Sequence, residues 1–150
     1  MRDDWTSIGT LNNEPGTRDL LRHNEPMNLV VIESPYAPDL TWTTEENIAY
    51  AIRAMHDCLE RGEAPYASHL LFTRPGILDD MVTVERELGI TAGLVWGANA
   101  DIIAVYIDHG ISGGMRLGIA QHQRLGKRIM VRALDREVTE SDIADVVGVR

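Results

Sequence analysis

The chain has 150 residues, the size of one ordinary domain, and it is long enough to form a sizeable hydrophobic core. Its 14 basic and 23 acidic residues give a net charge of −9, which argues against binding to nucleic-acid polymers, because such binding depends on basic surface. The single cysteine, Cys58, excludes an internal disulfide and favours a reducing cytoplasm. The polar N-terminus and the short apolar runs predict no signal peptide and no membrane span.

The first part of the chain divides into a lead-in and the start of a domain. Residues 1–27 mix glycine, asparagine, proline and charged residues without a sustained period, which predicts an N-terminal arm. The apolar run LVVIE at 29–33 predicts the first strand, and two prolines within 34–39 end the regular structure. We therefore expect a single α/β domain over residues 28–150.

A helix is predicted to follow the first strand. Thr43 or Thr44 can cap its start, and Gly62 is placed to end it. The apolar residues that recur at helical spacing are expected to form its buried face: Ile48, Ala51, Ile52, Met55 and Leu59.

The rest of the chain is predicted to alternate strands and helices. The expected elements are a strand at 68–72, a helix at 78–88, a link at 89–99, a central strand at 102–107, a helix at 115–125, a strand at 129–133 and a helix at 141–147. Alternation of this kind indicates parallel βαβ units, so the expected architecture is a three-layer α/β sandwich with a parallel sheet of four or five strands.

The central strand ends in a segment of polar and small residues. Because ligands of open α/β sheets bind outside the carboxyl ends of the strands, a site is expected there. Glycines let the backbone approach a ligand closely, and the next helix offers its positive end to an anion. The alternative is a simple turn in which Ser112 caps the helix. The residues concerned are Asp108, His109, Gly110, Ser112, Gly113 and Gly114.

Other polar and aromatic residues are candidates for the same crevice. If the first and central strands are neighbours, Tyr36 and Asp108 face it together. His69, on the second predicted strand, is either a ligand contact or a structural residue. Trp96 either walls a base pocket or packs between elements or subunits.

Several familiar motifs are absent from the sequence. It has no phosphate-binding loop that ends in Gly-Lys-Ser or Gly-Lys-Thr, and no Gly-x-Gly-x-x-Gly between a strand and a helix. Its five histidines are scattered, without metal-site spacing. We expect neither a bound metal nor an organic cofactor.

A set of short segments resembles the nucleoside 2-deoxyribosyltransferase superfamily, and above all its small relatives in phages and bacteria. These segments are ESPY at 33–36, ENI at 46–48, Asp101 before the central strand and residues 108–120 after it, within a similarity that spans roughly 28–133. The resemblance implies a flavodoxin-like fold and cleavage or transfer of the N-glycosidic bond of deoxynucleosides or their monophosphates, without metal or organic cofactor.

The resemblance also implies roles for particular residues. Ser34, Pro35 and Tyr36 would line the sugar and base pocket, and Asp101 or Asp108 would position the base or the sugar. A Ser-Gly pair in the glycine-rich turn would lie near the sugar or its phosphate. The full predicted ligand-binding set is Ser34, Pro35, His69, Trp96, Asp101, Gly110, Ser112, Gly113, Gly114, Met115 and Arg116.

The chain departs from the family pattern at the catalytic glutamate, which belongs in the helix after the glycine-rich turn. One alignment places Arg116 at that position and another places Gly118 there. Neither residue is a carboxylate. The glutamate matters because breaking an N-glycosidic bond develops positive charge at the sugar carbon, which a carboxylate stabilises or attacks.

Two functions of different class follow. The first is an N-glycosidase or deoxyribosyltransferase in which Asp108 or Glu33 replaces the missing glutamate, with Tyr36 or His69 as acid. The second is a protein that binds a nucleotide without turnover and grips an anionic group with Arg116 and the glycine-rich turn.

A homo-oligomer is also expected, because relatives often complete the pocket with a residue of a neighbouring subunit. Trp5, Trp42 and Trp96 are candidates for covering such an interface.

Overall fold

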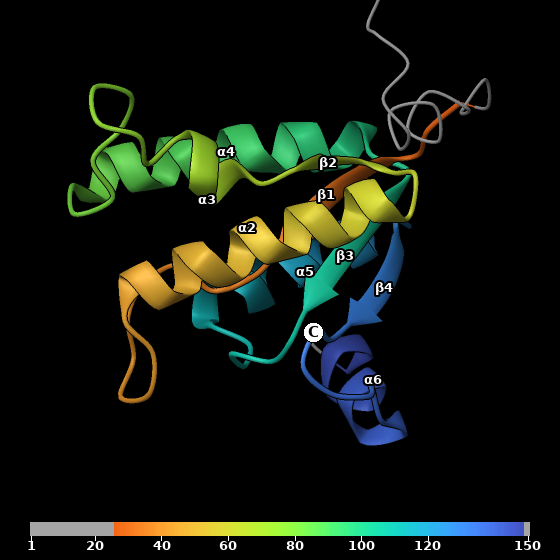
Figure 1. Ribbon diagram of the computed structural model, residues 1–150. Helices are drawn as coiled ribbons and strands as arrows, with labels where there is room; N and C mark the ends of the chain where they lie inside the picture. The colour runs from red at the N-terminus through yellow and green to blue at the C-terminus, as the bar shows by residue number, and fades with distance from the viewer. Residues whose placement is uncertain (1–25, 149–150) are drawn as a thin grey trace, which may run out of the picture.

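The computed structural model describes residues 26–148, so the arm predicted over 1–27, with Trp5, lies almost wholly outside the described residues. The elements run in the order β1 (Leu29–Glu33), α2 (Thr44–Glu60), β2 (Ala64–Tyr66), α3 (Ser68–Leu71), α4 (Thr83–Asn99), β3 (Ile102–Tyr106), α5 (Gly113–Arg124), β4 (Arg128–Arg132) and α6 (Glu140–Val147) (Figure 1).

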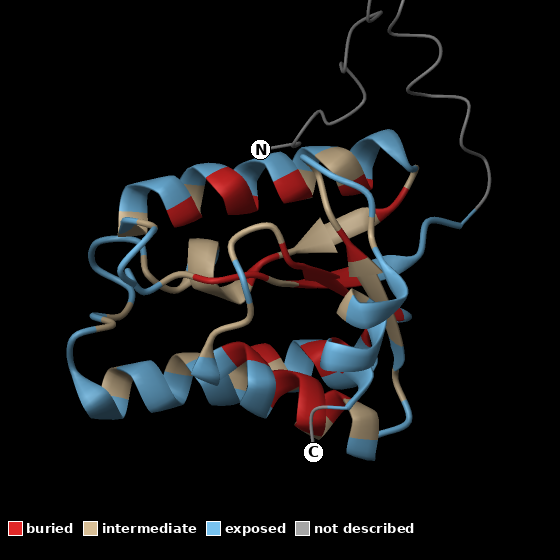
Figure 2. Cartoon of the chain, turned by 90° about the horizontal axis from the view of Figure 1, so that it is seen from below, coloured by how far each residue is buried: buried red, intermediate tan, exposed pale blue. Residues whose placement is uncertain are grey.

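The four strands form one parallel sheet in the order β2-β1-β3-β4. Val31 of β1 pairs with Tyr66 of β2 on one side and with Ile103 of β3 on the other. The sheet is the middle one of three layers, and its buried residues face helices on both sides (Figure 2). The predicted three-layer, flavodoxin-like α/β fold with a parallel sheet is therefore confirmed, and of the four or five strands expected, residues 26–148 form four.

Alternate residues of β1 serve the two faces of the sheet. Val30 and Ile32 pack with Tyr50 of α2, whereas Val31 packs with Ile119 of α5. Because side chains alternate across a strand, one short apolar run contributes to both halves of the core. All five residues of β3 are buried, as predicted for the central strand.

Two predictions between α2 and β3 were wrong. The second strand is Ala64–Tyr66, while residues 68–71 form a short helix, so His69 is helical. Among the described residues β2 pairs with β1 alone, and such an edge position tolerates its proline. The predicted link at 89–99 belongs to α4. Gly93 and Gly97 are sites of close packing within this helix, since an added Cβ would lie 2.9 Å from Ser68 Oγ and 2.0 Å from His122 Cε1, respectively.

The buried face of α2 also differs from the predicted one. Ile52 and Leu59 are each 54% exposed, whereas the helix buries Asn47, Tyr50, Ala51, Ala54 and Cys58. Small and polar side chains therefore face the sheet, and the polar ones form hydrogen bonds described below. The predicted cap at Thr43 is confirmed, because its Oγ1 accepts a hydrogen bond from the Glu46 amide.

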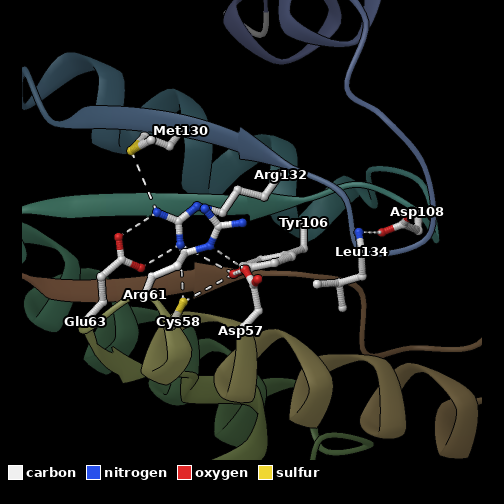
Figure 3. Close-up of polar contacts among 9 residues, drawn as sticks. All are labelled: Asp57, Cys58, Arg61, Glu63, Tyr106, Asp108, Met130, Arg132 and Leu134. Carbon is white, nitrogen blue, oxygen red and sulfur yellow. Dashed lines mark hydrogen bonds and ion pairs between the residues drawn. The ribbon is translucent and has the colours of Figure 1, made fainter. Parts of the chain in front are cut away.

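A polar cluster lies between α2 and the strands β3 and β4 (Figure 3). The guanidinium of Arg132 donates two hydrogen bonds of 2.7 Å to the carboxylate of Glu63, and both residues are buried. The hydroxyl of Tyr106 donates to Asp57 at 2.6 Å. The Arg132 guanidinium lowers the pKa of Glu63 by hydrogen bonding to its carboxylate. Through Glu63 and Arg132 this cluster links the residue before β2 to the end of β4, on the side of the sheet that α2 covers.

Candidate functional site

A cavity of about 620 Å³ opens at the carboxyl ends of β1 and β3. Its walls come from the loop after β1, from α3 and α4, and from the glycine-rich turn that leads into α5. From β1 the chain adds β2 on one side of the sheet and then β3 and β4 on the other side. The strand order therefore reverses between β1 and β3, which is the usual ligand position in this class of fold. The cavity is therefore the candidate functional site.

Most of the residues that the sequence singled out line this cavity. They are Glu33, Ser34, Pro35, Tyr36, His69, His109, Gly110, Ser112, Gly113, Gly114 and Met115. Four other candidates, Trp96, Asp101, Asp108 and Arg116, are not among the lining residues.

Asp108 anchors the loop that follows β4. Its carboxylate accepts hydrogen bonds from the Tyr50 hydroxyl at 2.5 Å, the Leu134 amide at 2.8 Å and the Asp135 amide at 3.2 Å. Figure 3 shows the contact with Leu134. The carboxylate thus already serves as the acceptor for three groups of the protein.

The other three residues lie elsewhere. Asp101 is at the amino end of β3, where its Oδ2 accepts a hydrogen bond of 2.7 Å from the Leu29 amide. Trp96 is 54% exposed on α4 and packs tilted against Tyr66, with ring centroids 5.0 Å apart. Arg116 is an exposed residue of α5.

Glu33 brings a carboxylate to the cavity from the end of β1. Its side chain reaches α5, where an added Cβ on Gly118 would lie 2.9 Å from Glu33 Oε1 and 3.4 Å from Oε2. On the same helix, Nε2 of His122 lies 3.5 Å from Oε1. The Glu33 side chain keeps 20% of its surface accessible. Glycine at 118 therefore leaves the space that the carboxylate fills.

A neutral polar pair lies next along the cavity wall. Ser34 Oγ and His69 Nε2 are 2.8 Å apart and hydrogen bonded. Burial lowers the pKa of His69 to about 4, because the charged imidazolium loses its hydration. The imidazole is therefore neutral at pH 7, so one of its ring nitrogens can donate a hydrogen bond and the other can accept one.

Asn47 joins the two loops that form the cavity. Its Nδ2 donates to the carbonyl oxygens of Ala37 at 3.0 Å and Tyr36 at 3.4 Å, in the loop after β1. Its Oδ1 lies 2.9 Å from Nδ1 of His109, in the loop after β3. Because an amide oxygen only accepts, His109 carries a proton on Nδ1. No role was predicted for Asn47, whose signal in the sequence is a polar residue on the sheet-facing side of α2.

The ring of His109 is held between two aromatic side chains. Trp42 stacks on one face at a centroid distance of 3.7 Å, and Tyr50 stacks on the other at 4.2 Å. Burial lowers the pKa of His109. The rim of the cavity at the end of β3 is therefore fixed by stacking as well as by hydrogen bonds.

The glycine-rich turn both caps α5 and forms part of the cavity wall. Ser112 caps α5, because its Oγ accepts a hydrogen bond of 3.2 Å from the Met115 amide. Gly113 and Gly114, the first residues of α5, line the cavity at the same time. Gly110 adopts a φ of +80°, a left-handed conformation that favours glycine.

Residues 28–132 match the model of a family described as a domain of unknown function, DUF7768, and the chain belongs to that family. No curated protein matches the chain. Among solved structures, the fold is similar to that of a 2-deoxyribosyltransferase from the psychrotolerant bacterium Bacillus psychrosaccharolyticus. The two are 17% identical over 79% of this chain and 81% of that one, with a TM-score of 0.54. At this identity the likeness shows a shared fold.

No helix within residues 26–148 is both long and apolar enough to cross a membrane. The same residues contain no group of three or more His, Cys, Asp or Glu side chains that could hold a metal ion.

Proposed function

We propose that this protein cleaves or transfers the N-glycosidic bond of a nucleoside or deoxynucleotide, with Glu33 as the catalytic carboxylate. The observation that carries the proposal is that the Glu33 carboxylate occupies the space in which a Cβ on Gly118 would lie, 2.9 Å from Oε1. Gly118 stands at one of the two positions where the family resemblance expects the catalytic glutamate. Here a carboxylate from β1 fills the space beside that position, so the same chemistry can come from a different element.

The proposed reaction breaks the bond between the sugar carbon C1′ and the base nitrogen, and its electron pair leaves with the base. An oxygen of Glu33 attacks C1′, which develops positive charge, and forms a glycosyl ester. The hydroxyl of Tyr36, which also lines the cavity, gives its proton to the leaving base. Water or a second base then attacks C1′, releases Glu33 and returns a proton to the Tyr36 oxygen.

The choice of Glu33 over Asp108 rests on their surroundings. Glu33 lines the cavity and keeps part of its side chain accessible. Asp108 accepts three hydrogen bonds from Tyr50, Leu134 and Asp135 and lies outside the lining. A carboxylate bound in this way would have to give up those bonds before it could attack a sugar, at a cost of about 1–3 kcal/mol for each group left unpaired.

In the same proposal, Ser34 and His69 bind the base. They form a neutral hydrogen-bonded pair on the cavity wall, which suits a heterocycle that offers both donors and acceptors. Because the pKa of His69 is about 4, its imidazole has no proton to spare as a general acid near pH 7. This is why the proposal gives the acid role to Tyr36.

The test moves the carboxylate from one element to the other. Purified protein is incubated with a panel of deoxynucleosides and their 5′-monophosphates, and free base is measured by chromatography. Glu33→Gln and Glu33→Ala are expected to abolish base release, and the double variant Glu33→Ala with Gly118→Glu is expected to restore it. Wild-type rates in Glu33→Gln would overturn the proposal.

Two carboxylate variants serve as controls. Asp101→Asn removes a carboxylate at the opposite end of the sheet and is expected to leave base release unchanged. Asp108→Asn is expected to lower stability while each folded molecule still releases base. Thermal stabilisation by a nucleotide without any base release would instead support the alternative function, a protein that binds a nucleotide without turnover.

We also propose that the protein forms a homo-oligomer. The support is a set of exposed apolar side chains on α4 and α5, namely Val84, Leu88, Val95, Trp96 and Leu117. Light scattering coupled to size exclusion measures the assembly state directly.

A further inference from the structure

We propose that His122 is a positioning residue, which contacts the carboxylate of Glu33 from the protein interior and holds it in place. Its importance for catalysis rests on the function proposed above. The contact itself is a property of the fold and can be tested without a substrate.

His122 lies on the same side of α5 as Gly118. The two residues are four positions apart and therefore neighbours on the helix surface. Helical side chains tilt toward the N-terminus of their helix, so the imidazole of His122 leans back toward Gly118. There its Nε2 lies 3.5 Å from Oε1 of Glu33. The imidazole is 1% exposed, so it reaches the carboxylate from the protein interior.

α4 provides the room for this ring. A Cβ on Gly97 would lie 2.0 Å from His122 Cε1, 2.8 Å from Nε2 and 2.9 Å from Nδ1. Any side chain at 97 would therefore displace the imidazole. The ring occupies a slot between α4 and α5, while the carboxylate occupies the space beside Gly118. Two glycines on different helices thus leave space for one imidazole and one carboxylate.

The two ring nitrogens of His122 have different surroundings. Nδ1 is buried and has no hydrogen-bond partner among the described residues. Nε2 faces a carboxylate oxygen. A proton on Nε2 would have a carboxylate oxygen 3.5 Å from its nitrogen, whereas a proton on Nδ1 would be buried without an acceptor among the described residues, so the contact favours the tautomer protonated at Nε2.

This arrangement would assign the two oxygens of Glu33 different tasks. Oε1 faces His122, which would leave Oε2 as the oxygen that approaches the sugar carbon. The distance of 3.5 Å is longer than an ordinary hydrogen bond, and catalytic contacts of this kind tighten when substrate fills the site. Misplacing a reacting group by 1 Å can lower a rate on the order of 10²-fold.

The kinetic test compares two substitutions at the same buried site. His122→Leu keeps an apolar side chain of similar size without a donor, and His122→Gln keeps an N–H donor at a similar distance from the backbone. We expect His122→Leu to lower kcat on the order of 10²-fold with KM nearly unchanged. We expect His122→Gln to recover most of that loss. Equal kcat in both variants would overturn the proposal, as would wild-type kcat in His122→Leu.

The spectroscopic test needs no substrate. In protein carrying ¹⁵N-labelled histidine, His122 is expected to show the tautomer protonated at Nε2, and Glu33→Gln is expected to shift that Nε2 resonance. Asp101→Asn, the matched control, leaves the resonance in place. Unchanged His122 signals in Glu33→Gln would overturn the proposal whatever the outcome of the base-release assay.

The two tests separate the two proposals. A shifted Nε2 resonance without base release in wild-type protein supports the contact and contradicts the proposed function. Base release that requires Glu33 but not the donor on His122 supports the function and contradicts the positioning role.

Discussion

The substitution Gly118→Ala separates the stability of α5 from the placement of Glu33. The added Cβ would lie 2.9 Å from Glu33 Oε1 and 3.3 Å from its Cδ, so the carboxylate must move. The obstructing group is the end of a flexible side chain, and a strained rotamer costs about 0.5–1.5 kcal/mol. Alanine stabilises a helix interior by about 0.8–1 kcal/mol relative to glycine. The two terms nearly cancel, so the free energy of unfolding should change by less than about 1 kcal/mol.

The effect on catalysis should be much larger. A carboxylate displaced by 1 Å is expected to lose a factor on the order of 10² in kcat, which corresponds to about 2.7 kcal/mol in activation free energy. Urea denaturation measures the stability, and chromatography of released base measures kcat. Arg124→Ala, a change at an exposed position in the last turn of the same helix, is the control and should leave kcat unchanged. Wild-type kcat in Gly118→Ala would show that the carboxylate does not act from this position.

Two further predictions concern stability. Glu63→Gln leaves the buried guanidinium of Arg132 without its counter-charge and should lower the free energy of unfolding by about 3–5 kcal/mol, whereas Asp135→Asn in the exposed pair with Arg53 should change it by less than about 1 kcal/mol. Urea denaturation of both variants decides this, and equal small losses would contradict the burial argument. For His69, whose pKa falls to about 4 in the folded protein, the unfolded chain binds the proton more tightly, so stability should fall as the pH is lowered from about 6.5 to 4, at up to about 1.4 kcal/mol per pH unit. His69→Asn should remove that part of the slope, and an unchanged slope would show that His69 is not buried as described.

Much of the fold could be predicted because local signals agreed with the tertiary structure. The run LVVIE at 29–33 and the apolar run at 102–107 are both strands, within one residue at each end. Thr43, one of the two threonines expected to cap the first helix, caps it, and Ser112 caps α5 as one of its two interpretations predicted. In each case the residues that form the element also carry the signal for it.

The helix predicted at 78–88 covers only the start of α4, and its continuation over 89–99 was missed for a physical reason. Its glycines at 89, 93 and 97 look like helix breakers in the sequence. In the structure Gly93 and Gly97 instead let Ser68 and His122 approach the helix closely. A glycine required by packing and a glycine that ends a helix look the same until the neighbouring element is known.

The site was predicted in outline and missed in its details. Residues of the loops that follow β1 and β3 do line the cavity, because the parallel sheet places those strand ends together. The contact of Glu33 with Gly118 and His122 joins positions about 85 residues apart, and no local pattern indicates it. The role of Asn47 likewise depends on two loops that the sequence does not bring together.

The loop after β1 is fastened along its length, yet one of its side chains is free of all contacts. The Asn47 amide donates to the carbonyl oxygens of Tyr36 and Ala37, and the cavity wall continues through Pro38 and Asp39. The Asp39 amide then closes a turn on the carbonyl oxygen of Trp42, whose ring stacks on His109. Leu40 lies within this turn and extends fully into solvent. Position 40 is therefore the natural place to attach a reporter group beside the cavity, because a new side chain there would leave the turn and the wall as they are.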